Sequence, residues 1–339
     1  MKRKAFILTE ILIGMTLQAW FAVILCGAFY MILNFSTSFQ QGFAAEDKGQ
    51  IVIAYFDSRI RNAGLGMWGC NGSKDIRAAF SDISALADDK TLCLPVAIVN
   101  SADGKVNVSR DTSGRFYSGN MVTLLYAHKD PNDVRLILCT DKKQSSIDVT
   151  NSSLSSNNKF NLIDKGKKGS QSYSDSEFGK AKEGRTYNIK HYAVIERSGV
   201  PVYTEAISPQ VRLQASPSKS PVTVYPMSEL LNIECQKLYI KQDTNGYNFV
   251  FQELNSSGKW DRPYYHTKDI LELYMTLDTK PAVPIFELRV LVSEGLNEYG
   301  STPKPKDWPG RWKNTGFDQY KVHVSKAVWK LYNLIPQFN

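Results

Sequence analysis

The sequence predicts an α+β fold in which one long amino-terminal helix packs on antiparallel β-sheet. Three observations support this prediction. Residues 6–35 form an apolar run with one charged side chain. Over residues 36–63 the apolar residues recur at helical spacing, and charged residues occupy the other faces. From residue 64 to residue 339 the chain carries short apolar or alternating segments bounded by turn residues, which are typical of antiparallel strands.

The apolar run at residues 6–35 is long enough to cross a membrane. As a helix it spans about 45 Å, and the hydrocarbon core of a bilayer is about 30 Å thick. The run is longer than the apolar region of a secretory signal peptide, and no small-x-small cleavage site follows it. Lys2, Arg3 and Lys4 precede it directly, so by the positive-inside rule we expect a cytoplasmic amino terminus and an exported remainder.

Glu10 is the charged side chain within this run. A carboxylate at mid-helix in a bilayer costs about 2.5 to 3.5 kcal/mol, so an acid in a membrane span is a candidate functional residue. The alternative is that Glu10 lies one turn inside the interface and reaches the headgroups. Both interpretations of Glu10 stand when this residue is considered alone.

The helix is predicted to continue beyond the membrane through residues 36–63. An apolar stripe at helical spacing would pack on the exported region; its members are Ala44, Ala45, Ile51, Val52, Tyr55, Phe56, Ile60 and Ala63. One helix from Phe6 to about Asn62 would be about 85 Å long. Gly27 and Gly42 are the places where we expect it to bend, because glycine is a weak helix former. Gly64 is the predicted carboxyl-terminal cap.

The order Lys-Arg-Lys-Ala-Phe-Ile-Leu-Thr-Glu at residues 2–10, followed by the apolar helix, resembles the class III signal of type IV prepilins and pseudopilins. In that family a short basic leader is removed just before a Phe, and a Glu lies at the fifth position after the cut. The resemblance implies a leader at residues 1–5, cleavage between Ala5 and Phe6, N-methylation of Phe6 and a role for Glu10 in assembly. Ala5 stands where the family usually has Gly.

Further segments resemble PilW-type minor pilins. They are Arg61-Asn62-Ala63-Gly64 with Gly69-Cys70, the stretch Met227–Tyr239 and the ending Leu331-Tyr332-Asn333. The resemblance implies a pilin-like fold with an enlarged β-rich head at residues 64–339. It places four residues of the stretch in the core, namely Leu230, Leu231, Ile233 and Leu238.

This resemblance implies a minor pilin that primes a type IV pilus or sits at its tip, without a cofactor or a bound metal. The implied location is the bacterial inner membrane, as a single-pass protein with a cytoplasmic amino terminus, and then the pilus. The implied partners are other major and minor pilins, prepilin peptidase, the inner-membrane assembly platform and the lipid bilayer. Two alternatives stay open: a GspJ-type pseudopilin of type II secretion, and a single-span anchored binding module that never enters a filament.

Several strands are expected in the head, at residues 95–100, 121–128, 134–139, 187–197, 200–205, 227–239, 247–254, 270–277, 286–292 and 319–334. Turn residues at 130–133, 198–199 and 243–246 predict three hairpins. Residues 141–185 are rich in Ser, Asn, Lys and Gly and are predicted to form a long polar loop. Such a loop is either a binding element or a tolerated surface insertion.

Five cysteines occur, with Cys26 in the apolar run and Cys70, Cys93, Cys139 and Cys235 in the exported part. In an oxidising compartment these four are candidates for two disulfides, with three connectivities. We favour Cys70 with Cys93 and Cys139 with Cys235. A zinc site is the rival interpretation, although the close Cys-x-x-Cys pairs of structural zinc sites are absent; buried thiols are the third.

The sequence lacks the motifs of several enzyme classes, and we expect no enzymatic activity. Its four histidines are far apart and lie outside HExxH, GxSxG and Walker patterns. Residues 64–69 satisfy GxGxxG, but a dinucleotide fingerprint opens a helix whereas this one closes a helix. A calcium EF-hand counted from Asp243 fails at Asn248 and Leu254, where Gly and Glu are needed.

The net charge of +8 raises the question of nucleic-acid binding. The lysines and arginines are scattered along the chain, and no basic stripe with interleaved aromatic residues is evident in the sequence. We therefore expect these charges to serve a solvated surface, and we predict no nucleic-acid partner.

Overall fold

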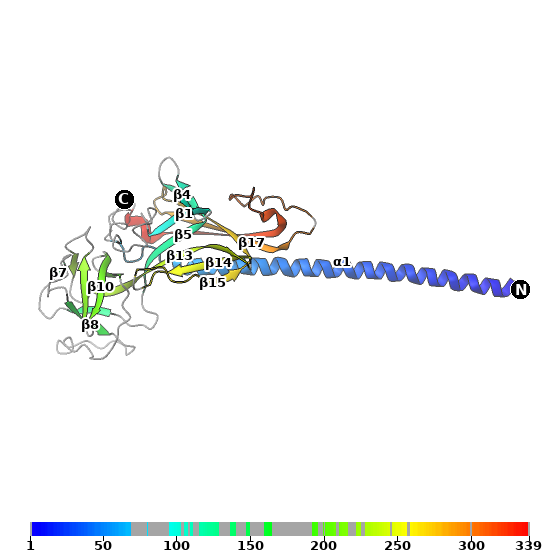
Figure 1. The fold of residues 1–339 in the computed structure, drawn as a ribbon, viewed down its shortest axis with the longest axis horizontal. Coiled ribbons are helices and arrows are strands. Elements are labelled where there is room, and N and C mark those ends of the chain that lie inside the picture. Colours follow the sequence, from blue (N-terminus) through cyan, green and yellow to red (C-terminus); the bar gives the residue numbers. More distant parts are fainter. Residues whose placement is uncertain are drawn as a thin grey trace.

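The computed structural model describes residues 2–68, 80, 95–102, 105–107, 109–110, 115–128, 136–139, 147–149, 159–164, 192–195, 199, 201–207, 210–215, 222–224, 228–244, 246–255, 258–298 and 300–337. It consists of one long helix, α1, with a β-rich head at its carboxyl-terminal end (Figure 1). The first half of α1 extends away from the head (Figure 1).

Helix α1 runs from Lys2 to Ile60. It is continuous through Gly27 and Gly42, where a bend was expected. The helix ends as predicted, because Gly64 adopts a left-handed conformation with φ of 76°. The Gly64 amide then donates a 2.9 Å hydrogen bond to the carbonyl of Leu125, which fixes the end of the helix to the sheet.

The described strands pair antiparallel throughout. The first nine are β1 (Val96–Ala102), β2 (Lys105–Asn107), β3 (Ser109–Arg110), β4 (Phe116–Gly119), β5 (Met121–His128), β6 (Leu136–Cys139), β7 (Ile147–Val149), β8 (Lys159–Asp164) and β9 (Tyr192–Ile195). The others are β10 (Pro201–Ile207), β11 (Gln210–Ala215), β12 (Val222–Val224), β13 (Glu229–Asp243), β14 (Gly246–Glu253), β15 (Tyr264–Lys268), β16 (Ile270–Asp278), β17 (Ile285–Leu296) and β18 (Tyr320–Lys330). Two 3-10 helices, η2 (Phe317–Gln319) and η3 (Tyr332–Gln337), flank β18.

These strands form two main sheets and one small one. The smaller main sheet has the order β18-β17-β16-β4-β3, and β7 pairs with β12 in a separate ribbon. The larger sheet has the order β2-β1-β5-β13-β6-β8-β11-β10-β9, with β14 paired to β13 and β15 paired to β14. Because β9 also pairs with β13, the strands from β13 through β6, β8, β11 and β10 to β9 form a closed circuit. The fold is α+β, as predicted.

The second half of α1 lies between the two main sheets. Phe56 connects them, with its ring centroid 5.9 Å from that of Phe249 on β14 and 6.4 Å from that of Phe286 on β17. The predicted apolar stripe supplies the helix side of this core through Ala45, Val52, Phe56, Ile60 and Ala63, all buried. Leu230, Leu231, Ile233 and Leu238 of β13 are buried as expected.

Two of the predicted hairpins are confirmed and one is wrong. Strands β9 and β10 pair across the turn that contains Gly199, and β13 pairs with β14 through Asp243 and Gly246. The hairpin expected at residues 130–133 would join β5 to β6 as antiparallel neighbours, but both strands pair with the same edge of β13 and run in the same direction. At 15 residues, β13 is long enough to pair with β5 along one part and with β6 along another. A distant strand thus displaces the local pairing.

The predicted polar loop at residues 141–185 contains two short strands, β7 and β8. β7 pairs with β12, and β8 pairs with β6 and β11. The loop prediction is wrong over these strands because partners distant in sequence complete their hydrogen bonding, and each strand is too short to show a clear period. The rest of the segment lies outside the described residues.

Candidate functional site

The exposed half of α1 is the largest apolar feature of the described chain. Between Leu12 and Phe43 its large apolar side chains project into solvent, including Trp20 at 72% exposure and Phe35 at 73%. By length and composition, this helix is apolar enough to cross a membrane. The helix is therefore divided into an exposed apolar half and a half that is packed into the head.

The predicted processing and assembly residues lie in the first turns of this helix. Ala5, Phe6 and Glu10 all belong to α1. Their side chains lie outside the described residues. Cleavage before Phe6 and the assembly role of Glu10 therefore stay predictions.

An aromatic ridge marks the part of α1 that approaches the head. Phe35 stacks on Phe39 with ring centroids 6.0 Å apart, and Phe39 meets Phe43 edge-on at 4.5 Å. The spacing of four residues places all three on one face of the helix. Phe39 and Phe43 also line a groove of about 350 Å³ between α1 and β18, whose other walls include Glu46 and His323.

At Gly49, α1 lies in close contact with the smaller sheet. A Cβ atom at this position would overlap the Oγ of Ser325 and lie 2.8 Å from its Cβ. Ser325 belongs to β18, and its Oγ is buried without a hydrogen-bond partner. A glycine here permits the helix to lie directly on the strand. Next to it, Lys48 forms a 2.6 Å ion pair with Asp269, which joins α1 to the residue between β15 and β16.

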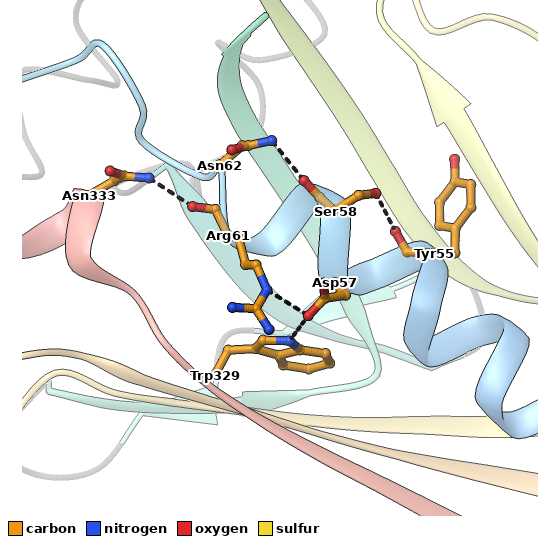
Figure 2. Close-up of polar contacts among 7 residues, drawn as sticks. All are labelled: Tyr55, Asp57, Ser58, Arg61, Asn62, Trp329 and Asn333. Atoms are coloured by element: carbon orange, nitrogen blue, oxygen red, sulfur yellow. Dashed lines mark hydrogen bonds and ion pairs between the residues drawn. The ribbon is translucent and has the colours of Figure 1, made fainter.

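Hydrogen bonds to Asp57 hold the last turns of α1 against the carboxyl-terminal region of the chain (Figure 2). The indole Nε1 of Trp329 donates a 2.6 Å hydrogen bond to Asp57 Oδ1, and Arg61 Nε donates to the same oxygen at 2.7 Å. Together these two donors hold the pKa of Asp57 below its ordinary value. Asn333 Nδ2 donates to the Arg61 carbonyl at 2.8 Å, which caps a carbonyl left free at the helix end.

On the opposite side of α1, Arg59 joins the helix to the larger sheet. Its guanidinium carbon lies 3.5 Å from the centre of the Tyr55 ring, and its Nε donates a 2.7 Å hydrogen bond to Gln236 Oε1. Gln236 Nε2 in turn donates to Glu253 Oε1 at 2.6 Å. Burial raises the pKa of the Tyr55 hydroxyl, so this group remains protonated. The His266 ring also packs against the Tyr55 ring, with their centroids 4.7 Å apart.

A partly buried acid lies on the face of the smaller sheet that points away from α1. Glu272 belongs to β16, and its Oε2 is buried without a hydrogen-bond partner. Burial raises the pKa of Glu272 to about 7, against the opposing effects of a hydrogen bond from Asn120 and the charge of Arg311. Two residues further along β16, Tyr274 meets Trp308 with ring centroids 6.3 Å apart. This face is therefore covered by the connection between β17 and β18.

The strand register excludes the favoured disulfide between Cys139 and Cys235. β6 pairs with β13 through Leu136 opposite Leu230 and Ile137 opposite Glu229. Because the strands are antiparallel, Cys139 lies beyond Glu229 on the side away from Cys235. The two cysteines are separated by about 20 Å or more at 3.3 Å per residue, whereas disulfide Cα atoms lie within about 7 Å. Cys70 and Cys93 lie outside the described residues, so their pairing stays a prediction.

Within the described residues, no group of three His, Cys, Asp or Glu side chains is placed to hold a metal ion. No family model, curated protein or solved structure matches this chain. The architecture is pilin-like: a long helix whose exposed apolar half extends from a head of antiparallel sheet packed around its second half.

Sequence patterns missed the residues that fasten the helix to the head. Asp57 and Arg61 are four residues apart in a predicted helix, which is a usable signal for their ion pair. Their contact with Trp329 joins residues 272 positions apart, and no local pattern indicates such a contact. From the sequence alone, Gly49 is only a weak helix former. Its role becomes evident from the position of β18 against the helix.

Proposed function

We propose that this protein is a minor pilin of a type IV pilus, made as a prepilin and packed through its amino-terminal helix to prime assembly or to sit at the pilus tip. Its enlarged β-rich head favours a priming or tip position, because a helical array of such heads would crowd. Its partners would be other pilins, prepilin peptidase, the assembly platform of the inner membrane and, before assembly, the lipid bilayer.

The division of α1 into two halves carries this proposal. The exposed apolar part from Leu12 to Phe43 is about 48 Å long at 1.5 Å per residue, whereas a bilayer core is about 30 Å thick. A simple membrane anchor needs only about 20 residues. The excess leaves the aromatic ridge near the head without lipid cover, and packing against neighbouring helices would cover it.

Glu10 supplies a specific docking group in this proposal. After cleavage before Phe6, the carboxylate of one subunit would be neutralised by the new amino group of a neighbour. An acid without such a partner is costly in lipid, so pairing favours docking of one helix beside another. A Glu10→Gln variant would keep the size of the side chain and remove its charge.

The decisive experiment is intact and amino-terminal mass spectrometry of the protein purified from membranes of cells with and without prepilin peptidase. We expect a chain that starts at methylated Phe6 only when the peptidase is present. Glu10→Gln should leave cleavage intact and reduce recovery of the protein with sheared pili. A chain that retains Met1 or Lys2 in both strains would overturn the proposal in favour of an anchored binding module.

A GspJ-type pseudopilin would undergo the same leader cleavage before Phe6. It would belong to a type II secretion system and not to a pilus. Co-purification separates the two: the proposed minor pilin is recovered with pilus subunits, whereas a GspJ-type pseudopilin is recovered with components of a secretion system. Deletion of the gene should abolish piliation in the first case and protein secretion in the second.

A further inference from the structure

Strand pairing gathers lysines and aromatic residues that are scattered in the sequence onto one face of β13, β14 and β15. In the central row Tyr239 lies opposite Val250, which lies opposite Tyr265. The row on one side contains Lys241, Asn248 and Lys268, and the row on the other contains Lys237 and Gln252. Successive rows are about 7 Å apart because same-face residues are two positions apart.

This face is the one that points away from α1. Phe249 and Phe251 of β14 contact Tyr55 of the helix, so Val250, between them, points to the opposite side. Tyr265 is 52% exposed and Tyr239 and Lys241 are partly exposed, whereas Val250, which lies between the two tyrosines in the row, is buried. We call the set Lys237, Tyr239, Lys241, Tyr265 and Lys268 the aromatic-basic face.

Cations and rings are already associated on the aromatic-basic face. Lys241 Nζ lies 5.4 Å from the centre of the Tyr265 ring. Lys237 Nζ lies 4.4 Å from the centre of the Trp260 ring at the edge of the same face. Asp243 is the carboxylate at the end of β13, beyond the last row. The rows themselves therefore carry three lysines and no acid.

We propose that the aromatic-basic face binds single-stranded nucleic acid, with bases stacked on Tyr239 and Tyr265 and phosphates held by Lys241 and Lys268. Aromatic rings interleaved with cations at a protein surface are an arrangement that holds unpaired bases and their backbone. The charge of the face is complementary to a polyanion.

The amides of this face favour a nucleic acid over a carbohydrate. Side-chain amides and carboxylates are the groups that can form several hydrogen bonds with sugar hydroxyl groups. Gln252 accepts a 3.1 Å hydrogen bond from Tyr239 and donates at 2.9 Å to the Asp261 carbonyl, so its amide is engaged within the protein. Asn248 is buried at 2% exposure. Within the three rows, the groups that remain at the surface are therefore cations and rings; the carboxylate of Asp243 lies beyond them.

The test measures the affinity of the full-length protein in detergent for a fluorescently labelled oligothymidine of twelve nucleotides. Fluorescence anisotropy gives this affinity at a series of salt concentrations. We expect Tyr265→Ala to weaken binding at least about fivefold and Tyr265→Phe to restore it, because stacking needs the ring and not the hydroxyl. The Lys241→Gln/Lys268→Gln pair should lower the slope of log affinity against log salt by about 1.4, at about 0.7 for each phosphate contact.

The matched control is Lys330→Gln/Tyr332→Ala, which removes the same residue types from exposed positions at the end of β18. An equal loss of affinity in the control, or binding that Tyr265→Ala leaves unchanged, would overturn the proposal. So would binding of an acidic polysaccharide such as polygalacturonate in place of the oligonucleotide. Thermal unfolding of each variant shows whether the sheet is intact, and none of these readouts depends on peptidase cleavage or pilus assembly.

Discussion

Gly49 of α1 lies against Ser325 of β18 so closely that a methyl group on the glycine would overlap the serine side chain. This contact sets how deeply the helix lies on the smaller sheet. On one side of it, Lys48 pairs with Asp269, and two turns further along the helix Asp57 binds Trp329. The helix is thus positioned by a close steric contact and by polar contacts at both ends of the packed half.

Gly49→Ala should destabilise the head although alanine is the better helix former. Overpacking lowers the free energy of unfolding by about 1 to 3 kcal/mol, and the better helix propensity of alanine raises it by about 1 kcal/mol. Gly42→Ala is the matched control, since a Cβ there meets nothing within 4 Å, and it should stabilise slightly. Denaturant unfolding in detergent measures both, and equal midpoints for the two variants would contradict the close contact. Adding Ser325→Ala should recover part of the loss in the Gly49→Ala protein.

Asp57→Ala should lower the free energy of unfolding by about 1 kcal/mol near neutral pH, because two donors lose their acceptor. The pKa of Asp57 is lowered in the folded state, so its contribution is present above the ordinary aspartate pKa of about 3.9 and is lost as pH falls through the folded value. The difference between wild type and variant should therefore shrink in acid. Urea unfolding at pH 7 and pH 3 tests this.

One variant separates the contribution of Trp329 from that of Arg61. Trp329→Phe removes the indole donor and keeps most of the ring, so it should reproduce part of the loss seen in Asp57→Ala and add little to it in the double variant. Asp47→Ala, at an exposed position of the same helix, is the control for a general effect of charge. A loss in Asp57→Ala that is the same at both pH values would refute the role of the carboxylate.

Glu272→Gln should stabilise the protein above pH 7 and flatten its pH dependence. The pKa of Glu272 is raised to about 7 in the folded state, above the ordinary value of about 4.3, so the folded protein holds the proton more tightly. Stability from this group is therefore full below about pH 4.3 and falls as pH rises toward 7, by on the order of 3 kcal/mol. Glu298→Gln, at an exposed position, should leave the profile unchanged. Unfolding free energies between pH 4 and pH 8 give the comparison.

Phe39→Ala/Phe43→Ala should reduce incorporation into filaments without changing the stability of the isolated protein. These two rings belong to the aromatic ridge and are more than half exposed, so their loss removes little packing within the chain. The measurement is the amount of protein recovered with sheared pili, alongside its unfolding midpoint in detergent. Leu296→Ala, another exposed apolar residue, is the control. Unchanged recovery would show that the ridge takes no part in assembly.

The predictable parts of this molecule are those whose cause is local. The composition of residues 6–35, the stripe from Ala45 to Ile60 and the left-handed glycine at position 64 indicated α1 and its end without knowledge of the fold. The hairpin of β13 and β14 followed from its turn residues in the same way. The pairing of β5 could not be inferred, because the residues after it favour a hairpin with β6, whereas both strands pair with β13, more than 100 positions later.

Local patterns predict an apolar helix long enough to cross a membrane, its amphipathic continuation and antiparallel strands, because periodicity and turn chemistry act over a few residues. Contacts between distant segments establish which strands are neighbours, that Cys139 lies far from Cys235, that Trp329 binds Asp57 of the helix, and that Lys241, Tyr265 and Lys268 share one face. These relationships arise from the register of strands distant in sequence. Register is settled by burial of the whole core.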